Sequence, residues 1–182
     1  MKILVKTILL ALGLAVFAVG CASPAQPSAM IPKSFNITKH LSGSVSVVVT
    51  GGNKTNPAWK SDISSEDFST ALVEALNQSA LFASVASANT DYRLAVQLVK
   101  VISPNWGLTF TDSVVSEWQL VRVRDSAVVS DEYITTSFSA TPGDAFAAIK
   151  RLRLANEGAA RANIAEGIRR LSGLNLEQPV AQ

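Results

Sequence analysis

Apolar and polar residues alternate along four segments of this chain, and a period of two is typical of strands that are buried on one face. The second segment also holds an irregularity, because Val99, Val101 and Ile102 break the alternation and so predict a β-bulge. A weaker extended segment lies at residues 84–88. The four predicted strands are 42–52, 92–102, 114–123 and 128–138.

Two other segments repeat their apolar residues every three or four positions, which predicts amphipathic helices. The first begins after Ser64, where Asp67 three residues later gives a pattern close to a capping box. This helix is expected to end near residues 80–82. The second is predicted to run from Pro142, a residue suited to the first turn of a helix, to Leu171.

The order of these elements is strand, helix, three strands, helix, or β-α-β-β-β-α. It predicts an α+β fold in which a twisted, mainly antiparallel sheet of four to five strands carries both helices on one face. The opposite face of the sheet is then open either to solvent or to a partner. Its predicted side chains are those of Arg93, Gln97, Glu117, Gln119 and Thr135.

The N-terminal segment has a different pattern, since residues 7–20 carry no charge and follow a start that holds Lys2 and Lys6. A helix of this length reaches only about 20 Å, less than the roughly 30 Å of a bilayer core. A basic start and a short apolar run are typical of a secretory signal peptide. The segment ends in the motif AVGC, whose last residue, Cys21, is the single cysteine of the chain.

This motif resembles the lipobox, the cleavage signal of bacterial lipoproteins. The resemblance implies that Cys21 becomes the mature N-terminus, with a diacylglyceryl group on its sulfur and an acyl chain on its amine. Because Ala22 rather than an aspartate follows, it also implies sorting to the periplasmic face of the outer membrane. The alternative is an ordinary signal peptide with an incidental cysteine, although a lone free thiol is unusual in an oxidising compartment.

Composition and charge define the remaining organisation of the chain. We interpret residues 1–20 as the signal peptide, 21–35 as the lipidated cysteine with a flexible tether, 36–175 as a single α+β domain and 176–182 as a disordered tail. The chain has 16 basic and 14 acidic residues, and the signal holds two lysines and no acid, which leaves 14 of each. This balance gives no reason to expect a nucleic-acid partner.

Longer segments of the chain carry a second resemblance. The residues TGGNKTNPAWKSDISSEDFSTALVEALNQSALF (50–82), Trp118 and Leu120 in a strand, and RLRLANEGAARANIAEGI (151–168) are similar to a family of small, uncharacterised proteobacterial outer-membrane lipoproteins. The layout also resembles that of accessory lipoproteins in envelope assembly. These include penicillin-binding-protein activators, curli secretion components and auxiliary lipoproteins of transport systems.

Residues suited to catalysis or metal binding are sparse. His40 is the single histidine, there is no G-x-S-x-G motif, and one histidine with a lipidated cysteine cannot form the usual zinc sites. We therefore predict no catalytic residue, no metal, no cofactor and no enzymatic activity. A periplasmic hydrolase or acyltransferase, the less favoured alternative, would have to use His40 or the acid pair Asp131 and Glu132.

Two segments could bind a partner. The loop after the first strand holds Asn56, Pro57 and Trp59, and an indole in a polar loop can anchor a protein. The last helix is rich in arginine, including Arg153 and Arg161, although its glutamates could simply pair with them. We therefore predict an envelope lipoprotein, anchored in the membrane through its lipid, that binds another envelope protein in assembly or transport. An accessory lipoprotein that binds lipid or lipopolysaccharide is the alternative, and the oligomeric state is left open.

Overall fold

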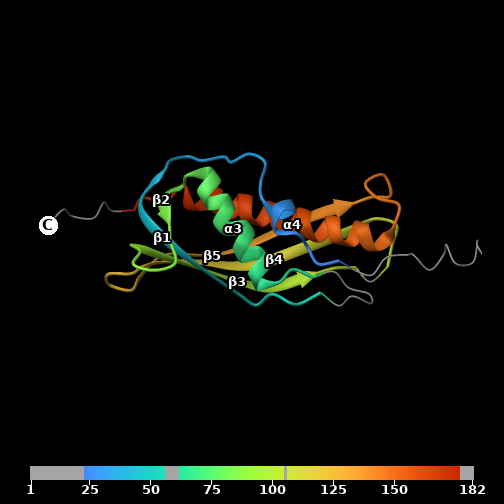
Figure 1. The fold of residues 1–182 in the computed structure, drawn as a ribbon, viewed down its shortest axis with the longest axis horizontal. Helices are drawn as coiled ribbons and strands as arrows, with labels where there is room; N and C mark the ends of the chain where they lie inside the picture. Colours follow the sequence, from blue (N-terminus) through green and yellow to red (C-terminus); the bar gives the residue numbers. More distant parts are fainter. Residues whose placement is uncertain (1–22, 56–61, 105, 177–182) are drawn as a thin grey trace, which may run out of the picture.

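The computed structural model describes residues 23–55, 62–104 and 106–176. These residues form three helices and one five-stranded sheet (Figure 1). In chain order the elements are α2 (Pro27–Met30), β1 (Leu41–Thr50), α3 (Ser65–Ser79), β2 (Phe82–Val85), β3 (Tyr92–Ile102), β4 (Phe110–Arg122), β5 (Ala127–Ala140) and α4 (Ala148–Leu171).

The sheet has the strand order β2-β1-β3-β4-β5. The last three strands form an antiparallel meander, whereas β1 pairs in parallel with both β2 and β3. The predicted α+β fold is therefore confirmed, with a sheet that is mixed rather than wholly antiparallel. The parallel pairing of β1 with β2 follows from the helix between them, because a helical crossover returns the chain in the same direction.

The parallel pairing of β1 with β3 has a different cause. The connection between β2 and β3, residues 86–91, passes from one side of β1 to the other. Asp91 at its end bonds to Ser44 of β1, and the register then pairs Val45 with Tyr92. The predicted bulge is confirmed further along β3, where the pairing with β4 shifts between Leu98 and Lys100.

Helix α3 begins where the sequence predicts. The Ser64 hydroxyl accepts a hydrogen bond from the Asp67 backbone N–H at 3.0 Å and donates to the Asp67 carboxylate at 2.7 Å. Two donors at the start of the helix are thus satisfied locally. The last helical residue is Ser79, and Ala80 caps the helix with a φ of 48°, in the left-handed region. This end agrees with the predicted range.

Helix α4 begins six residues later than predicted, at Ala148 rather than Pro142. The Asp144 carboxylate accepts hydrogen bonds from the backbone N–H and the hydroxyl of Thr141, at 2.7 and 2.8 Å. These bonds close residues 141–144 into a separate turn. Pro142 therefore lies in that turn and not in the first turn of the helix.

The predicted flexible tether of residues 21–35 is wrong for residues 25–30. Ala25 and Met30 are buried in the main core, and the short helix α2 packs against α3 and α4. The Gln26 N–H donates to the Glu157 side chain at 3.0 Å, and Arg161 donates to the Ala29 carbonyl at 2.7 Å. The proline-rich composition concealed this docking, because it depends on contacts with residues of α4 that lie 131 and 132 positions away.

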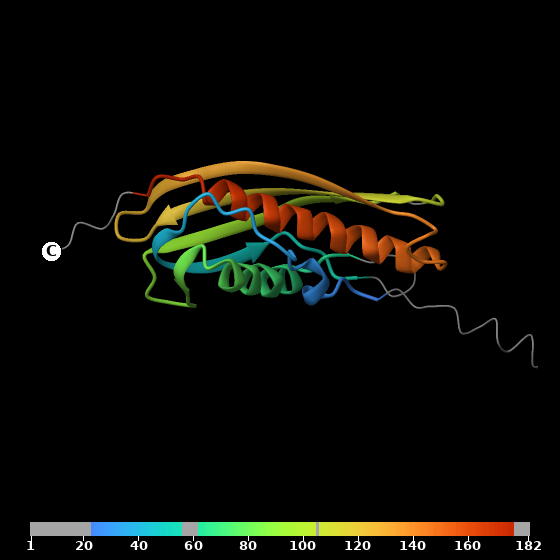
Figure 2. The same cartoon turned by 90° about the horizontal axis from the view of Figure 1, so that it is seen from above.

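Both long helices lie on one face of the sheet, as Figure 2 shows. The core fills the space between them and is made of apolar side chains from α3, α4 and the inward positions of every strand. Within the described residues, no helix combines the length and hydrophobicity needed to cross a membrane.

A polar network is buried between α4 and the sheet. The Asn163 side-chain oxygen accepts hydrogen bonds from the Ser116 hydroxyl at 2.7 Å and from the Trp118 indole N–H at 3.2 Å. Its amide group donates to the Ile134 carbonyl at 3.3 Å. One side chain of α4 is thereby bonded to both β4 and β5. Such a network fixes the position of the helix along the strands.

Candidate functional site

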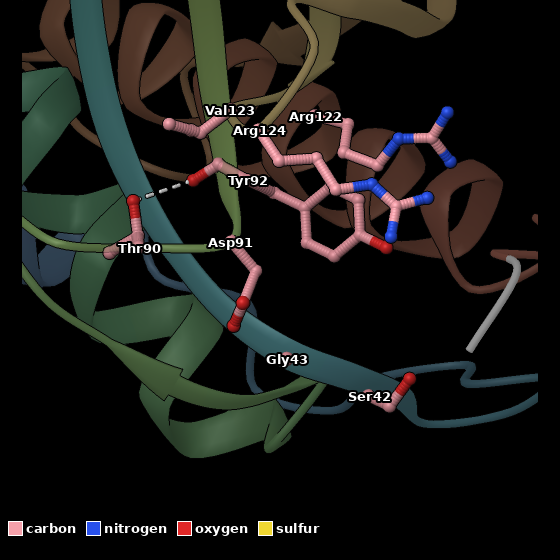
Figure 3. Close-up of a pocket in the computed structure, with 8 residues that line it drawn as sticks. All are labelled: Ser42, Gly43, Thr90, Asp91, Tyr92, Arg122, Val123 and Arg124. Atoms are coloured by element: carbon pink, nitrogen blue, oxygen red, sulfur yellow. Dashed lines mark hydrogen bonds between the residues drawn. The ribbon is translucent and has the colours of Figure 1, made fainter. Parts of the chain in front are cut away.

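A pocket of about 200 Å³ lies at the end of the sheet where β3 begins and β4 ends (Figure 3). Strand β1 passes along one side of it, and the start of the β4–β5 turn forms another. Tyr92 contributes an almost fully buried ring. The lining residues are Ser42, Gly43, Thr90, Asp91, Tyr92, Arg122, Val123 and Arg124.

The carboxylate of Asp91 is held by β1. It accepts hydrogen bonds from the Ser44 backbone N–H at 2.7 Å and from the Ser44 hydroxyl at 2.8 Å. Gly43, with a φ of +94°, lets β1 pass close to this carboxylate. The bonds from Ser44 lower the pKa of Asp91 below its usual value. Asp91 is therefore charged at neutral pH. Its hydrogen bonds connect the start of β3 to β1, and it does not act as a proton donor.

Two guanidinium groups border the pocket, and Figure 3 shows Arg122 and Arg124 on the same side as the Tyr92 ring. Arg122 forms an ion pair with Asp125 at 3.0 Å, and Arg124 lies 3.8 Å from the same carboxylate. The bond from Arg122 is the main reason why the pKa of Asp125 is lowered. The two arginines at the border of the pocket are thus balanced by Asp125 and by Asp91 in the lining. The volume of the pocket is below the roughly 300–1,000 Å³ of drug-sized ligand sites.

A second, more open hollow of about 620 Å³ lies between α4, β5 and residues 34–36. Glu166 accepts bonds from Arg169 at 2.6 Å and from Arg170 at 2.7 Å, and Arg170 also pairs with Glu132 at 2.7 Å. The bonds from Arg169, followed by those from Arg170, lower the pKa of Glu166 to about 2. The charges of this hollow are satisfied within the chain.

The outer face of the sheet, away from the helices, is open. It carries the five side chains predicted for it, none of which is buried. It also carries Tyr133 and Val48, which the sequence analysis did not name. Tyr133 is 62% exposed and lies opposite Glu117 in the register of β4 and β5. The negative charge of Glu117, together with its hydrogen bond, raises the pKa of Tyr133 above the usual value. Val48 of β1 is also exposed on this face.

Four of the predicted site residues, Cys21, Asn56, Pro57 and Trp59, lie outside the described residues. The two arginines of α4 make contacts within the chain. Arg153 lies 3.5 Å from Glu157, and Arg161 packs over the Phe138 ring at 5.5 Å in addition to binding the Ala29 carbonyl. Their role in partner binding remains a prediction.

The residues considered for catalysis do not meet in one site. Nδ1 of His40 lies 2.7 Å from the Ala80 carbonyl and must carry the proton there, because a carbonyl oxygen only accepts. Asp131 and Glu132 are neighbours in β5, so they point to opposite faces of the sheet. Asp131 bonds to Gln119 at 3.2 Å, whereas Glu132 bonds to Arg170. No cluster of histidine, cysteine or carboxylate side chains suited to a metal ion occurs among the described residues.

The sequence analysis missed the pocket in Figure 3 because its lining comes from three separate segments. The signal that could have found it is the run Arg122-Val123-Arg124-Asp125 at the end of a predicted strand. Two arginines with an aspartate at a turn indicate a charged strand end. The contribution of Asp91 to the pocket could not be predicted, because it depends on the position of β1 between β2 and β3 in the sheet.

No protein-family model and no curated protein matches the sequence of the chain significantly. Solved structures do match its fold. Protein XCC0632 from Xanthomonas campestris, of the family DUF330, is 16% identical with a TM-score of 0.65, and the match covers 82% of this chain and 95% of that one. Protein CT253 from Chlamydia trachomatis is 9% identical with a TM-score of 0.56, covering 74% and 98%. PelC from Paraburkholderia phytofirmans, solved as a dodecamer, is 17% identical with a TM-score of 0.50, covering 79% and 96%. The chain therefore shares an α+β fold with these three bacterial proteins.

Proposed function

We propose that this protein is a non-catalytic lipoprotein of the bacterial cell envelope, anchored through Cys21, that binds a protein partner on the open face of its sheet. The observation that carries the proposal is the asymmetry of the sheet. Both long helices cover one face, and the other presents Tyr133 and Val48 to solvent. A two-layer fold of this kind leaves one face of its sheet uncovered and available to a partner.

The composition of that surface suits protein binding. Tyr133 offers a large ring with a polar tip, a combination that is enriched in protein interfaces. Around it lie the charged and amide groups of Glu117, Gln119 and Asp131, which could form a polar rim. The pocket in Figure 3 is small for a lipid ligand, and the larger hollow beside α4 is open and lined by paired charged groups. Both observations support protein binding over the lipid-binding alternative.

The anchoring part of the proposal is supported by the N-terminal sequence, with its two lysines, its uncharged run and the AVGC motif. We place the mature protein on the periplasmic face of the outer membrane. Growth of cells with labelled palmitate should label the wild-type protein and leave Cys21→Ser unlabelled. An unlabelled wild-type protein would contradict the anchor.

The partner surface can be tested in living cells by photo-crosslinking. A benzoylphenylalanine at position 133 should give one adduct of defined mass in the membrane fraction. The matched control is the same residue at position 77, which is exposed on α3 on the opposite layer of the fold. An adduct of twice the chain mass would identify a second copy as the partner, an arrangement for which the PelC dodecamer is a precedent in this fold. Equal adducts at both positions, or none at 133, would reject the open face as the binding surface.

A further inference from the structure

The most exposed large apolar side chains of the described protein lie in two loops. Trp106 and Leu108, in the β3–β4 loop, are 87% and 76% exposed, and Phe146, in the β5–α4 loop, is 99% exposed. Large apolar side chains that stay this exposed contribute almost no hydrophobic stabilisation to the fold, because little of their surface leaves water. Where several of them gather, they indicate a surface that becomes covered in the working protein.

The two loops belong to the same end of the molecule. Phe110, the first residue of β4, pairs with Ala140, the last residue of β5, so the loops before and after this pair are neighbours. A small second core of Phe110, Ala140, Leu152 and Ala155 lies directly beneath them. Figures 1 and 2 both show the β3–β4 and β5–α4 connections at one extremity, opposite the end that carries the C-terminal described residue.

A buried arginine fixes the outward direction of Phe146. Arg151 of α4 is 5% exposed, and its guanidinium packs over the Phe110 ring at 5.6 Å. The same group donates hydrogen bonds to the carbonyls of Ala145 and Phe146, at 2.9 and 2.6 Å. The backbone of the loop is thus bound to the body of the protein, while the Phe146 ring projects into solvent.

The first described residues lead toward the same end of the molecule. The Gln26 N–H bonds to Glu157, nine positions into α4, or about 14 Å from the first residue of the helix. In Figures 1 and 2 the described segment that precedes α2, drawn in blue, runs toward the extremity with the two loops. Three residues from Ser23 to Gln26 span up to about 10 Å, and two more to Cys21 add up to about 7 Å. This length of chain is sufficient to bring a lipid on Cys21 level with the loops.

We propose that Trp106, Leu108 and Phe146 form an apolar tip that inserts into the surface of the lipid bilayer beside the anchor. The inference rests on the proposed lipidation of Cys21. A lipid surface fits these residues because tryptophan favours the interface between headgroups and acyl chains, and because leucine and phenylalanine favour the apolar side.

Single introduced cysteines test the inference in the full lipidated protein. Because lipid occupies the native sulfur, Leu108→Cys or Phe146→Cys supplies the one free thiol for an environment-sensitive NBD fluorophore. The matched control is Val128→Cys, an exposed apolar position at the opposite end of the sheet, next to the β4–β5 turn. Each variant is reconstituted into vesicles of phosphatidylethanolamine and phosphatidylglycerol, with and without nitroxide-labelled lipid.

We expect the fluorophore at 108 and 146 to shift its emission to shorter wavelengths and to be quenched by the nitroxide lipid several-fold more than at 128. Flotation of the vesicles reports the anchor separately. Protein that floats while positions 108 and 146 remain as water-exposed as 128 overturns the tip and leaves the anchor intact. Protein that fails to float overturns the anchor and, with it, the tip. An emission shift that depends on protein density and is insensitive to nitroxide lipid also overturns the inference, because a second copy then covers the tip.

Discussion

Gly167 of α4 lies so close to Trp118 of β4 that a Cβ atom at position 167 would come within 2.4 Å of the indole ring. The ring cannot easily retreat, since Trp118 is buried and its N–H is bonded to Ser116 and Asn163. We expect Gly167→Ala to lower the free energy of unfolding by about 1–2 kcal/mol, because overpacking outweighs the gain in helix propensity. Urea unfolding followed by circular dichroism measures this loss.

Gly158→Ala provides the matched comparison on the same helix. A Cβ there would meet the Phe138 ring at 2.2 Å, but this ring is 39% exposed and has room to turn outward. The expected change is below about 1 kcal/mol, because the gain in helix propensity offsets a smaller steric cost. Equal losses for the two variants would show that the freedom of the facing ring does not decide the outcome.

The buried network around Asn163 gives a second prediction. Asn163→Leu keeps the approximate volume but leaves the Ser116 hydroxyl without its acceptor and the Ile134 carbonyl without that donor. We expect a loss of about 2–3 kcal/mol in the free energy of unfolding, the usual range for buried polar groups that lose their partners. The same substitution at the exposed Asn77 should change stability by less than about 0.5 kcal/mol. Comparable losses at both sites would exclude the network as the cause.

The ion cluster on α4 predicts a dependence on pH. Hydrogen bonds from Arg169 and Arg170 lower the pKa of Glu166 from 4.5 to about 2. A lowered pKa in the folded state stabilises the protein above pH 4.5, and this contribution disappears as the pH falls toward 2. Because the group is partly exposed, we expect Glu166→Gln to lose about 1 kcal/mol at pH 7 and almost nothing near pH 2. Urea midpoints of both proteins across this range give the answer, and a constant difference at all pH values would contradict it.

Arg151 should control the rigidity of the loop that presents Phe146. Arg151→Lys retains the charge but cannot reproduce the planar guanidinium group that contacts two carbonyls and the Phe110 ring. In detergent, we expect chymotrypsin to cleave after Phe146 several-fold faster in this variant. Cleavage after Trp106, in the neighbouring loop, serves as the internal control and should keep its rate. Acceleration at both sites would indicate general unfolding instead.

The contrast between the two long helices explains how far the sequence could predict the fold. The start of α3 depends on Ser64 and Asp67, three positions apart, so a local pattern was sufficient. At the start of α4, two local structures compete. Pro142 favours the first turn of a helix, whereas hydrogen bonds from Thr141 to the Asp144 side chain favour a separate turn. The turn forms, and the helix therefore begins later. The bulge near Val99 was readable for the same reason as α3, since it interrupts a local alternation.

Features built from distant residues could not be predicted. Ala25 and Met30 look like part of a proline-rich linker until α4 provides Glu157 and Arg161 to bind the neighbouring backbone. The pocket at the strand ends likewise requires Ser44 and Asp91 to meet across a crossover that no local pattern announces. The arginines of α4 were visible in the sequence. Which of them form ion pairs or hydrogen bonds within the chain depends on how the helix packs.

The docking of α2 on α4 has a consequence for how this protein would work at a membrane. A long free leader would allow the domain to move through a wide volume. With the anchor at Cys21 that we propose, a leader bound at Gln26 and Ala29 would leave only a few free residues between the lipid and the domain. Helix α4, with its 24 residues, is about 36 Å long. With the bilayer at one extremity, the arginine-bordered pocket at the other would stand at a set height above the lipid. The protein would then act as a spacer of defined length.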